Sequence, residues 1–576
     1  MTAPRPSPTP RTPPDLTRPT ATESESLSRE SPSAEAPSAE SPGAGRVAGY
    51  HRTARTVTPD ELPAHAAQLL AAGFRVALIA GHDDSGLRHR PPGRGHDGDV
   101  GDGGAALRAV YLFTATAPDR RVELHVPLDP HRPQVPSLAG LSFPAGRFER
   151  EMRDLFGIVA AGHPLPRRLV RHFHWPRGWY PMLADAGEPP AFGDQDGPYP
   201  FRIVEGPGVY EIPVGPVHAG MIEPGHFRFS VVGETILKFK ARLWFVHRGI
   251  EKLFQDRSPQ DGLELAERIS GDTSVGHALA FCQAVEDARS VTVGDDALRL
   301  RAILLELERL YNHVTDIGAL CNDVGHSILN AHAGRIREQL LRINDQVTGH
   351  RLLRGALHPG GACLRRLPDP AALQAIAADI GEVVTLALDH SVVRDRFTGT
   401  AVLTAEQAGD LGTLGYVARA SGLTLDARHD HPTLTPPHPR TVHIRTDGDV
   451  LARFLARAEE ITASVAMITT WVGQLDGRHH ATTPLTTHHH PDDTHPDNAT
   501  QDPHGRRSGV GIVEGWRGTI VHRVELGPDG LLTRVKIADP SFLNWPALPV
   551  ALTGTIVPDF PLVNKSFNLS YAGNDL

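Results

Sequence analysis

The amino-acid sequence predicts an α+β protein: a small α/β N-terminal domain followed by a large, mainly helical-bundle domain with β segments at its start and its end. Three observations support this fold class. Short β-branched and aromatic runs accompany a helix-like stretch before residue 185. Apolar residues recur at helical spacing through the middle of the chain. Strand-like runs then return near the end.

The first 185 residues divide into a polar tail and a small domain. Residues 1–45 consist of Pro, Ser, Thr, Ala and Glu with almost no large apolar side chain, so we expect a disordered tail. Residues 46–185 are expected to form the α/β domain, with a helix near 62–70 and strands in FRVALIA, AVYLFTAT and RVELHVPL. The polar stretch 83–104 predicts a long surface loop between the first two strands.

The second domain is expected over residues 201–576, after a Pro-, Gly- and Asp-rich linker at 186–200. A β-like segment at 201–214 opens it. The helical pattern predicts a bundle whose helices include Leu298 to Ile317 and the ranges 335–352, 371–388 and 450–472. Two strand runs close the chain, GIVEGWRGTIVHRVEL and LTRVKIA, separated by the turn GPDG.

Composition excludes several classes of protein. The chain has 58 Lys and Arg against 67 Asp and Glu, a net charge of −9, which argues against nucleic acid as a partner. Three widely spaced cysteines, Cys282, Cys321 and Cys363, build neither a disulfide framework nor a Cys-x-x-Cys metal site, as expected of a reducing cytoplasm. No uninterrupted apolar run approaches the roughly 18 residues that span a bilayer. We therefore expect a soluble chain, able to dock on a membrane protein.

The first informative motif lies within residues 135–170, where charged residues surround an apolar anchor. Taken alone, it is typical of an amphipathic surface helix with solvated ion pairs. Its residue pattern, however, resembles the signature of the small hydrophilic C-type subunits of NADH-quinone oxidoreductase (complex I). That signature is E-R-E-x-x-D-L-F-G-I followed by G-H-P. The matching residues are Glu149, Arg150, Glu151, Asp154, Leu155, Phe156, Gly157, Ile158, Gly162, His163 and Pro164. Arg147 replaces the aromatic residue that the family has before the motif.

The second motif is a Gly- and Pro-rich turn, GPVH followed by EPGH, that brings His218, Glu223 and His226 together. Such a turn can project proton carriers into a cleft. The surrounding stretch 211–254 resembles the family shared by the D-type core subunits of complex I and the large subunits of membrane-bound nickel–iron hydrogenases. The resemblance implies that Glu223 is a proton-transfer glutamate, and that His218 or His226 faces a quinone headgroup.

The same resemblance assigns a helix segment, HRGIEK, that begins with His247 and Arg248. Its row of charges could relay charge or simply be ion-paired, and the sequence leaves both interpretations open.

Two further strings concern the metal centre. The hydrogenases hold nickel and iron with two Cys-x-x-Cys pairs, because soft thiolates suit these metals. The resemblance places Ser270 and Thr273 at the first pair, and Ser541 and Asn544 at the second. Hydroxyls and an amide cannot replace thiolates, so no nickel–iron centre and no metal ligand are expected. Complex I supplies a tyrosine to the quinone near the first pair, where this chain reads Ser270, Gly271, Asp272. The residues expected to line the cofactor cleft are Ser270, Asp272, Thr273, Ser541, Asn544, His247 and Arg248.

Two polar groupings remain. Arg309 and His313 lie on one face of the helix that also carries Glu306 and Glu308, which predicts a polar seam of ion pairs inside the bundle. The stretch 477–507 is expected to be an exposed, solvated insertion, although its histidines could chelate nickel or zinc. These histidines are His479, His480, His488, His489, His490, His495 and His504.

Together the resemblances imply a fused C/D-type subunit of a membrane-associated oxidoreductase, in the hydrogenase-like branch that includes the formate hydrogenlyase type. The chain would lie on the cytoplasmic face of the membrane, bound to integral membrane subunits. An iron–sulfur cluster in a small partner subunit would supply electrons, and a quinone would take protons from Glu223, His218 or His226. Two alternatives stay open: a hydrogenase with an altered metal site, and a non-catalytic scaffold that holds the iron–sulfur subunit on a membrane arm.

Overall fold

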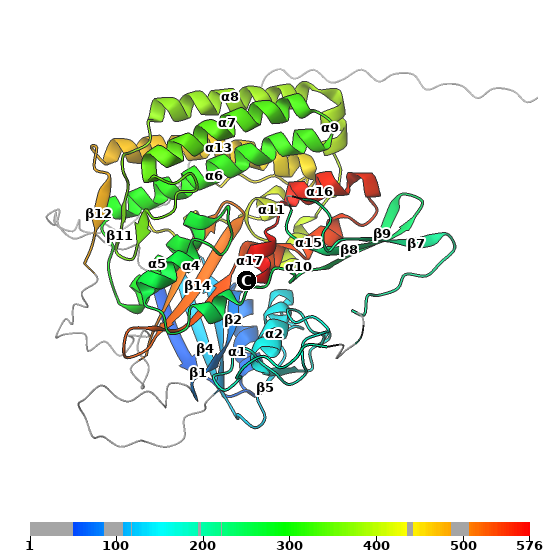
Figure 1. Cartoon of the computed structure of the whole chain (residues 1–576), viewed down its shortest axis with the longest axis vertical. Coiled ribbons are helices and arrows are strands. Elements are labelled where there is room, and N and C mark those ends of the chain that lie inside the picture. Colours follow the sequence, from blue (N-terminus) through cyan, green and yellow to red (C-terminus); the bar gives the residue numbers. More distant parts are fainter. Residues whose placement is uncertain are drawn as a thin grey trace, which may run out of the picture. The chain divides into compact units, whose positions relative to one another are not determined.

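A four-stranded sheet forms the N-terminal part of the chain, in the order β1–β4–β3–β2 (Figure 1). A computed structural model describes residues 50–85, 107–116, 118–193, 197, 199–220, 222–434, 442–484 and 506–576. The strands are β1 (His51–Thr56), β2 (Arg75–Asp83), β3 (Leu107–Ala115) and β4 (Arg120–Leu128), and α1 (Leu62–Ala71) joins β1 to β2. β1 runs parallel to β4, and the other pairs are antiparallel.

The helix and three of these strands confirm the sequence prediction, whereas β1 was missed. Only Arg52 is buried in its sequence HRTART, so no apolar alternation marks the strand. The predicted tail and most of the predicted 83–104 loop lie outside the described residues.

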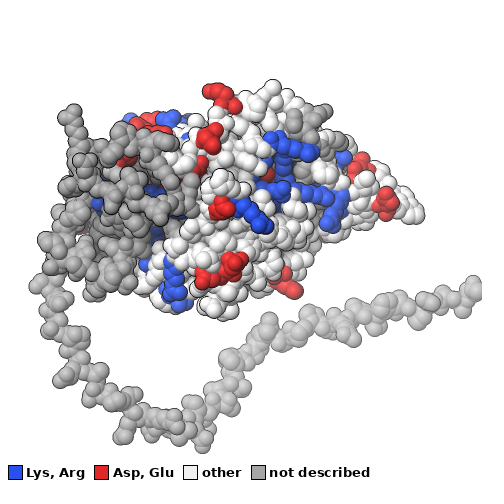
Figure 2. Space-filling view, turned by 90° about the horizontal axis from the view of Figure 1, so that it is seen from below, with Lys and Arg blue, Asp and Glu red and all other residues white. Residues whose placement is uncertain are grey.

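Helix α2 (Phe143–Phe156) carries the first motif and packs on β2. Its three carboxylates are not solvated, because Glu149, Glu151 and Asp154 are all buried. For these acidic residues the interpretation as a surface helix with solvated ion pairs is therefore wrong. Burial raises the pKa of Glu149 to about 7, although the Ser137 hydroxyl and a backbone N–H donate to it. Two short parallel strands, β5 (Gln134–Pro136) and β6 (Val159–Ala161), flank α2. Lys and Arg side chains gather on part of the face seen from below (Figure 2).

An antiparallel sheet of β7 (Val209–Val214), β8 (His226–Val232) and β9 (Thr235–Arg242) opens the second half of the chain. The predicted β-like segment 201–214 is a strand only from Val209 onward. The turn that carries His218 and Glu223 connects β7 to β8.

Four long helices lie side by side in a bundle: α6 (Asp295–Asp323), α7 (Ser327–Thr348), α8 (Pro370–Asp389) and α13 (Val450–Gln474) (Figure 1). All four were predicted from apolar spacing. By length and composition, α8 is the one described helix that could cross a membrane, with a mean hydropathy of 1.6. It nevertheless packs on α7 and α13 through apolar residues at helical spacing, which include Leu373, Ile376, Ile380 and Val383.

A second antiparallel sheet lies against α5 (Ser274–Ala288): β13 (Arg507–Gly515), β14 (Gly518–Leu526) and β15 (Leu532–Ala538). The run GIVEGWRGTIVHRVEL is therefore two strands that turn at Trp516 and Arg517. Gly511 lets α5 approach β13 closely, because a Cβ there would lie 1.9 Å from the carbonyl oxygen of Ala280. This contact fixes α5 relative to the sheet.

Shorter elements complete the structure, and β10, β11 and β12 pair in one small sheet. β12 lies inside the predicted 477–507 insertion, whose residues 485–505, with His488, His489, His490, His495 and His504, are outside the described part. The shorter elements are α3 (Ile250–Leu253), α4 (Pro259–Ala266), β10 (Leu357–His358), β11 (Gly361–Cys363), α9 (Ser391–Phe397), α10 (Ala405–Leu411), α11 (Gly415–Ala420), α12 (Ala427–Asp430), β12 (His480–Thr482), α14 (Pro540–Asn544), α15 (Ala547–Ala551), α16 (Phe560–Phe567) and α17 (Tyr571–Asp575).

Buried ion pairs join the N-terminal sheet to the β13–β15 region. Arg108 on β3 donates to both oxygens of Glu525 at 2.5 and 2.7 Å. Arg523 on β14 donates to Glu123 on β4 at 3.1 Å, and Arg52 also contacts Glu123 at 2.8 Å. Burial alone would raise the pKa of Glu123, but the two arginines hold it well below its usual value. The division into 46–185, a 186–200 linker and 201–576 stays a prediction.

Candidate functional site

The turn between β7 and β8 lies against the C-terminal helix α17. An oxygen of the exposed Glu223 carboxylate accepts a hydrogen bond from the backbone N–H of Ala572 at 3.0 Å. The imidazole of His218 lies 6.3 Å from the Tyr571 ring, and its Nε2 is buried without a hydrogen-bond partner. Burial lowers the pKa of His218, so its imidazole is neutral at pH 7. The structure thus brings two of the three predicted proton carriers to α17.

The third predicted carrier, His226, has a different set of contacts. Its Nδ1 lies 3.1 Å from the carbonyl oxygen of Gly215, and its Nε2 accepts from Nε of Arg228 at 3.2 Å. One ring nitrogen therefore bonds the turn, and the other bonds a side chain of β8. Its proposed role as a proton carrier stays untested.

Hydrogen bonds among three serines connect the two segments that the resemblance places at the thiolate positions. The hydroxyl oxygens of Ser270 and Ser570 are 2.9 Å apart, and the backbone N–H of Ser570 donates to Oγ of Ser541 at 3.0 Å. All three residues are buried. Ser270 and Ser541 are thus held together through a residue of the C-terminal segment.

Asp272 forms the charged part of the same region. Its carboxylate accepts two hydrogen bonds from the Arg517 guanidinium, both at 2.7 Å, and further bonds from Ser270 and Thr273 at 3.1 and 3.0 Å. Burial alone would raise the pKa of Asp272, but Arg517 and the two hydroxyls lower it to about 2. Asp272 therefore presents a fixed negative charge, bound to a fixed cation.

Asn544 does not open into this region. Its Oδ1 accepts from the backbone N–H of Leu414 at 2.8 Å, and its Nδ2 donates to the Leu414 carbonyl at 3.1 Å. The amide is buried and bonds both polar groups of the Leu414 backbone. Asn544 therefore fixes the segment just before α11.

His247 and Arg248 also contact the C-terminal segment. Nδ1 of His247 lies 2.6 Å from the Asp575 carbonyl oxygen, and the Arg248 guanidinium donates to the carbonyls of Arg268 and Ile269 at 3.1 and 2.6 Å. These bonds tie the segment after β9 both to α17 and to the residues just before Ser270. Burial lowers the pKa of His247.

Within the charged segment HRGIEK, Glu251 is ion-paired. Glu251 accepts from Lys536 at 3.0 Å and pairs with Arg534 at 2.8 Å. Lys536 also donates to both oxygens of Glu151 at 2.9 Å. The two motifs found separately in the sequence, one with Glu151 and one with Glu251, therefore meet at a single buried lysine on β15.

The donor set does not fit a nickel–iron centre. At the four positions that the resemblance assigns to thiolates stand three hydroxyls and an amide, and each is already hydrogen-bonded to protein: Ser270, Thr273, Ser541 and Asn544. Cys282 and Cys321 are buried elsewhere, on α5 and α6, and burial raises the pKa of both thiols. Cys363 is exposed on β11. None of these three cysteines stands at one of the four positions that the resemblance assigns to thiolates.

One group in the described part of the chain has the proximity of a metal site: His82, Asp84 and Glu525, with ligand atoms within 4.8 Å of one another. Arginines already neutralise its carboxylates. Arg108 donates to both, and Arg506 lies 2.6 Å from Asp84. A cation there would have to displace these guanidinium groups.

Several residues of the region were missed by the sequence analysis. Ser570 and Arg517 were not among the residues expected to line the cleft. His277 was also missed: its Nε2 lies 3.0 Å from Asp539 and its Nδ1 lies 3.0 Å from Nε2 of His522. Neither local spacing nor periodicity indicates a pairing of residues roughly 245 to 300 positions apart, so the sequence carries no local signal for these contacts.

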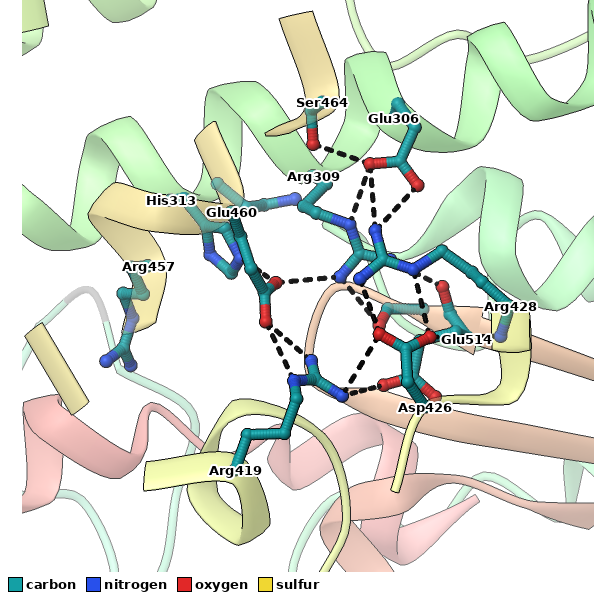
Figure 3. Close-up of polar contacts among 12 residues, drawn as sticks. Glu306, Arg309, His313, Arg419, Asp426, Arg428, Arg457, Glu460, Ser464 and Glu514 are labelled. Atoms are coloured by element: carbon teal, nitrogen blue, oxygen red, sulfur yellow. Dashed lines mark hydrogen bonds and ion pairs between the residues drawn. The ribbon is translucent and has the colours of Figure 1, made fainter. Parts of the chain in front are cut away.

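The predicted polar seam is confirmed inside the bundle, next to the β13–β14 turn. Arg309 donates to Glu306 at 3.0 Å and to Glu460 at 3.2 Å, and His313 Nε2 lies 2.8 Å from Glu460. Burial alone would raise the pKa of Glu460, but Arg419 and the His313 hydrogen bond bring it well below its usual value. Figure 3 shows this network extending through Arg419, Asp426, Arg428, Ser464 and Glu514.

Comparisons with known proteins show which family the chain is similar to. Residues 56–189 match the family described as "Respiratory-chain NADH dehydrogenase, 30 Kd subunit", and residues 323–575 match its "49 Kd subunit". Residues 248–321 match "Nickel-dependent hydrogenase". Formate hydrogenlyase subunit 5 of Escherichia coli is 31% identical over 79% of this chain and 79% of its own length. The chain belongs to this complex I and hydrogenase large-subunit family.

Other members of the family are subunits of related complexes. Hydrogenase-4 component G of Escherichia coli is 32% identical over 74% of this chain and 73% of its own length. The C/D subunit of NADH-quinone oxidoreductase from Bacteroides thetaiotaomicron is 29% identical over 63% of this chain and 73% of its own length. A chain of an archaeal membrane-bound sulfane sulfur reductase shares the fold, with a TM-score of 0.55, 22% identity, and coverage of 64% of this chain and 99% of that one. The protein is thus a subunit of a membrane-associated respiratory oxidoreductase complex.

Proposed function

We propose that the chain forms the quinone-reaction cleft of its complex, against a small partner subunit that holds an iron–sulfur cluster. One observation carries the proposal: segments that are far apart in sequence converge on the C-terminal segment. Ser570 joins Ser270 to Ser541, and Ala572 binds Glu223. The segments around Glu223, Ser270 and Ser541 are therefore hydrogen-bonded to one another through the C-terminal segment.

Protons for the reaction would come from the β7–β8 turn. Reduction of a quinone to its hydroquinone consumes two electrons and two protons. The partner's cluster would supply the electrons, and Glu223 is an exposed carboxyl group that can deliver a proton and be reprotonated from water. The neutral imidazole of His218 can donate a hydrogen bond to a quinone oxygen, which stabilises the negative charge that develops there.

The location of the complex follows from the same proposal. Integral membrane subunits would hold the chain on the cytoplasmic face of the membrane, where a lipid-soluble quinone can reach the cleft. The exposed apolar side chains of Val217 and Ile222, 82% and 46% exposed at the turn, are suited to a quinone or a partner surface.

The test uses the complex purified from its native membranes. Glu223→Gln and His218→Ala should each reduce quinone reduction about tenfold or more, because each removes a proton or hydrogen-bond donor. Reduction of a soluble dye by the iron–sulfur cluster should stay unchanged. Glu234→Gln, on the exposed β8–β9 turn, is the matched control. Unchanged quinone reduction in both cleft variants would remove the basis of the proposed site.

The scaffold alternative is favoured by one observation, that Asn544 and the serines are fully engaged within the protein. It predicts that the cleft variants alter neither quinone nor dye reduction, while deletion of the chain prevents assembly of the complex. The hydrogenase alternative requires nickel. Elemental analysis of the complex should find no stoichiometric nickel in this chain, and nickel bound near Ser270 and Ser541 would reverse that conclusion.

A further inference from the structure

An open cleft of about 450 Å³ lies beside α2, and none of the residues proposed for the quinone cleft lines it. Its arginines are Arg153, Arg167, Arg168, Arg171 and Arg177. Asp154 is the one carboxylate among the described residues that line it.

The first motif positions the loop that carries these arginines. Oδ2 of Asp154 accepts hydrogen bonds from the backbone N–H groups of Leu169, Val170 and Arg171 at 2.7, 2.8 and 3.2 Å. Arg150 donates to the carbonyls of Arg167 and Arg168 at 2.9 and 3.0 Å. The helix α2 therefore holds both the amides and the carbonyls of the loop.

A second arginine holds the loop from the opposite side. Arg242, at the end of β9, donates to the carbonyls of Leu169, Val170 and Arg171. The loop is thus fixed between two elements before any ligand arrives. Such preorganisation lowers the entropy that binding would otherwise cost.

The guanidinium groups are themselves oriented by backbone carbonyls. Arg153 donates to the Pro166 carbonyl at 2.7 Å, and Arg167 donates to the Pro200 carbonyl at 3.0 Å. A carbonyl orients a guanidinium without neutralising its charge, and each guanidinium carries five N–H donors in a planar fork. Arg153 and Arg167 therefore keep the charge and the donors that a tetrahedral oxyanion would accept.

Aromatic side chains line the rest of the cleft. Arg171 lies over the ring of Tyr180, 5.1 Å from its centroid, and Tyr199 and the 36% exposed Phe173 also face the cleft. These side chains offer apolar contact beside the cationic group. A cleft of this volume is in the range that accommodates a small organic ligand.

We propose that this cleft binds a phosphate-bearing molecule, with its phosphate on Arg153 and Arg167 and its organic part against the aromatic side chains. Arginine is the residue best suited to phosphate, because its fork matches two oxygens at once. The phosphate could belong to a soluble compound or to a phospholipid headgroup. This binding is independent of quinone reduction.

The test measures binding of inorganic pyrophosphate to the purified complex by isothermal titration calorimetry at low ionic strength. The double variant Arg153→Gln/Arg167→Gln should weaken binding about tenfold or more. The control, Arg335→Gln/Arg342→Gln on the exposed face of α7, removes the same total charge far from the cleft and should change binding less than about twofold. Arg153→Lys/Arg167→Lys, which keeps the charge but loses the fork, should fall between them and guards against misfolding of the first variant.

Vesicles distinguish the two sources of the phosphate. Cosedimentation with phosphatidylglycerol–phosphatidylcholine vesicles, lost in Arg153→Gln/Arg167→Gln and competed by pyrophosphate, identifies a lipid headgroup. Pyrophosphate binding without such cosedimentation identifies a soluble ligand. The proposal is overturned if the unmodified complex binds neither probe, or if the cleft and control variants weaken binding equally.

Discussion

Lys536 should be essential for stability, because it is the cation shared by two buried carboxylates from different parts of the chain. Its side chain is 3% exposed, and the side chains of Glu151 and Glu251 are 8% and 5% exposed. The substitution Lys536→Met keeps an unbranched side chain, one atom shorter, and removes the charge and the donors.

The size of the stability loss follows from the carboxylate that the substitution leaves unpaired. Glu251 keeps its ion pair with Arg534, so the loss falls on Glu151. Burial raises the pKa of Glu151, and Lys536 is the main group that opposes this effect. Removing one partner of a buried ion pair costs about 3–5 kcal/mol in free energy of unfolding. We expect a loss in that range at pH 8.

The loss should depend on pH. Without Lys536 the pKa of Glu151 in the folded state rises further above its value in the unfolded chain. Over the interval between those two pKa values the folded state binds more protons, so stability falls as the pH rises. Lys536→Met should therefore be less destabilising at pH 5, where Glu151 is protonated at little cost, than at pH 8.

The assay is urea unfolding, followed by tryptophan fluorescence at pH 5 and pH 8. Lys238→Met, on the exposed side of β9, is the matched control and should stay within about 0.5 kcal/mol of the unmodified protein. Adding Glu151→Gln to Lys536→Met should restore much of the loss, because no buried charge then remains unpaired. A Lys536→Met protein as stable as the control at pH 8, or no recovery in the double variant, would refute this reasoning.

Three further predictions follow from contacts described above. Gly511→Ala should lower the free energy of unfolding by about 1–3 kcal/mol in thermal or urea unfolding, because the new Cβ would meet the Ala280 carbonyl. Gly271→Ala is the control, because a Cβ there would have nothing within 4 Å, and it should leave the stability nearly unchanged. Asp154→Ala should lower the free energy of unfolding by about 3 kcal/mol or more, since three backbone N–H groups lose their acceptor. The 166–171 loop should then be cleaved faster by protease, and cleavage no faster than in the unmodified protein would contradict this. Burial lowers the pKa of His172 to about 4, so on acidification the unfolded chain binds a proton before the folded chain does. The free energy of unfolding should therefore fall as the pH drops from about 6.5 through 4. His172→Gln should make that pH dependence smaller in unfolding curves.

The sequence was most informative where local periodicity decides the structure. The bundle helices α6, α7, α8 and α13 were predicted to within several residues, because each presents a continuous apolar stripe to its neighbours. Strand β1 was missed because its stability comes from pairing with β4 and from the contacts of Arg52, not from an apolar face. The turn at Trp516 and Arg517 was missed because both flanking strands are buried on both faces and read as one run.

The candidate site was predictable only in part, for a related reason. The family wording pointed to Glu223, Ser270 and Ser541, and the structure connects all three through the C-terminal segment. The bridging role of Ser570 was beyond prediction, since a residue 300 positions away from Ser270 leaves no local trace in the sequence. His226 and Asn544 matched the family motifs as well. In the structure, however, His226 bonds the Gly215 carbonyl and the Arg228 side chain, and Asn544 bonds the Leu414 backbone.

The buried ion pairs between the N-terminal sheet and the β13–β15 region have a consequence for how the chain assembles. Each half presents charges, such as Glu123 on one side and Arg523 on the other, that water would solvate well if the halves were separate. Two free polypeptides would have to find each other and dehydrate those groups at cellular concentrations. Fusion into one polypeptide replaces that encounter with an intramolecular one at a high effective concentration, so even a polar interface of this kind can close stably.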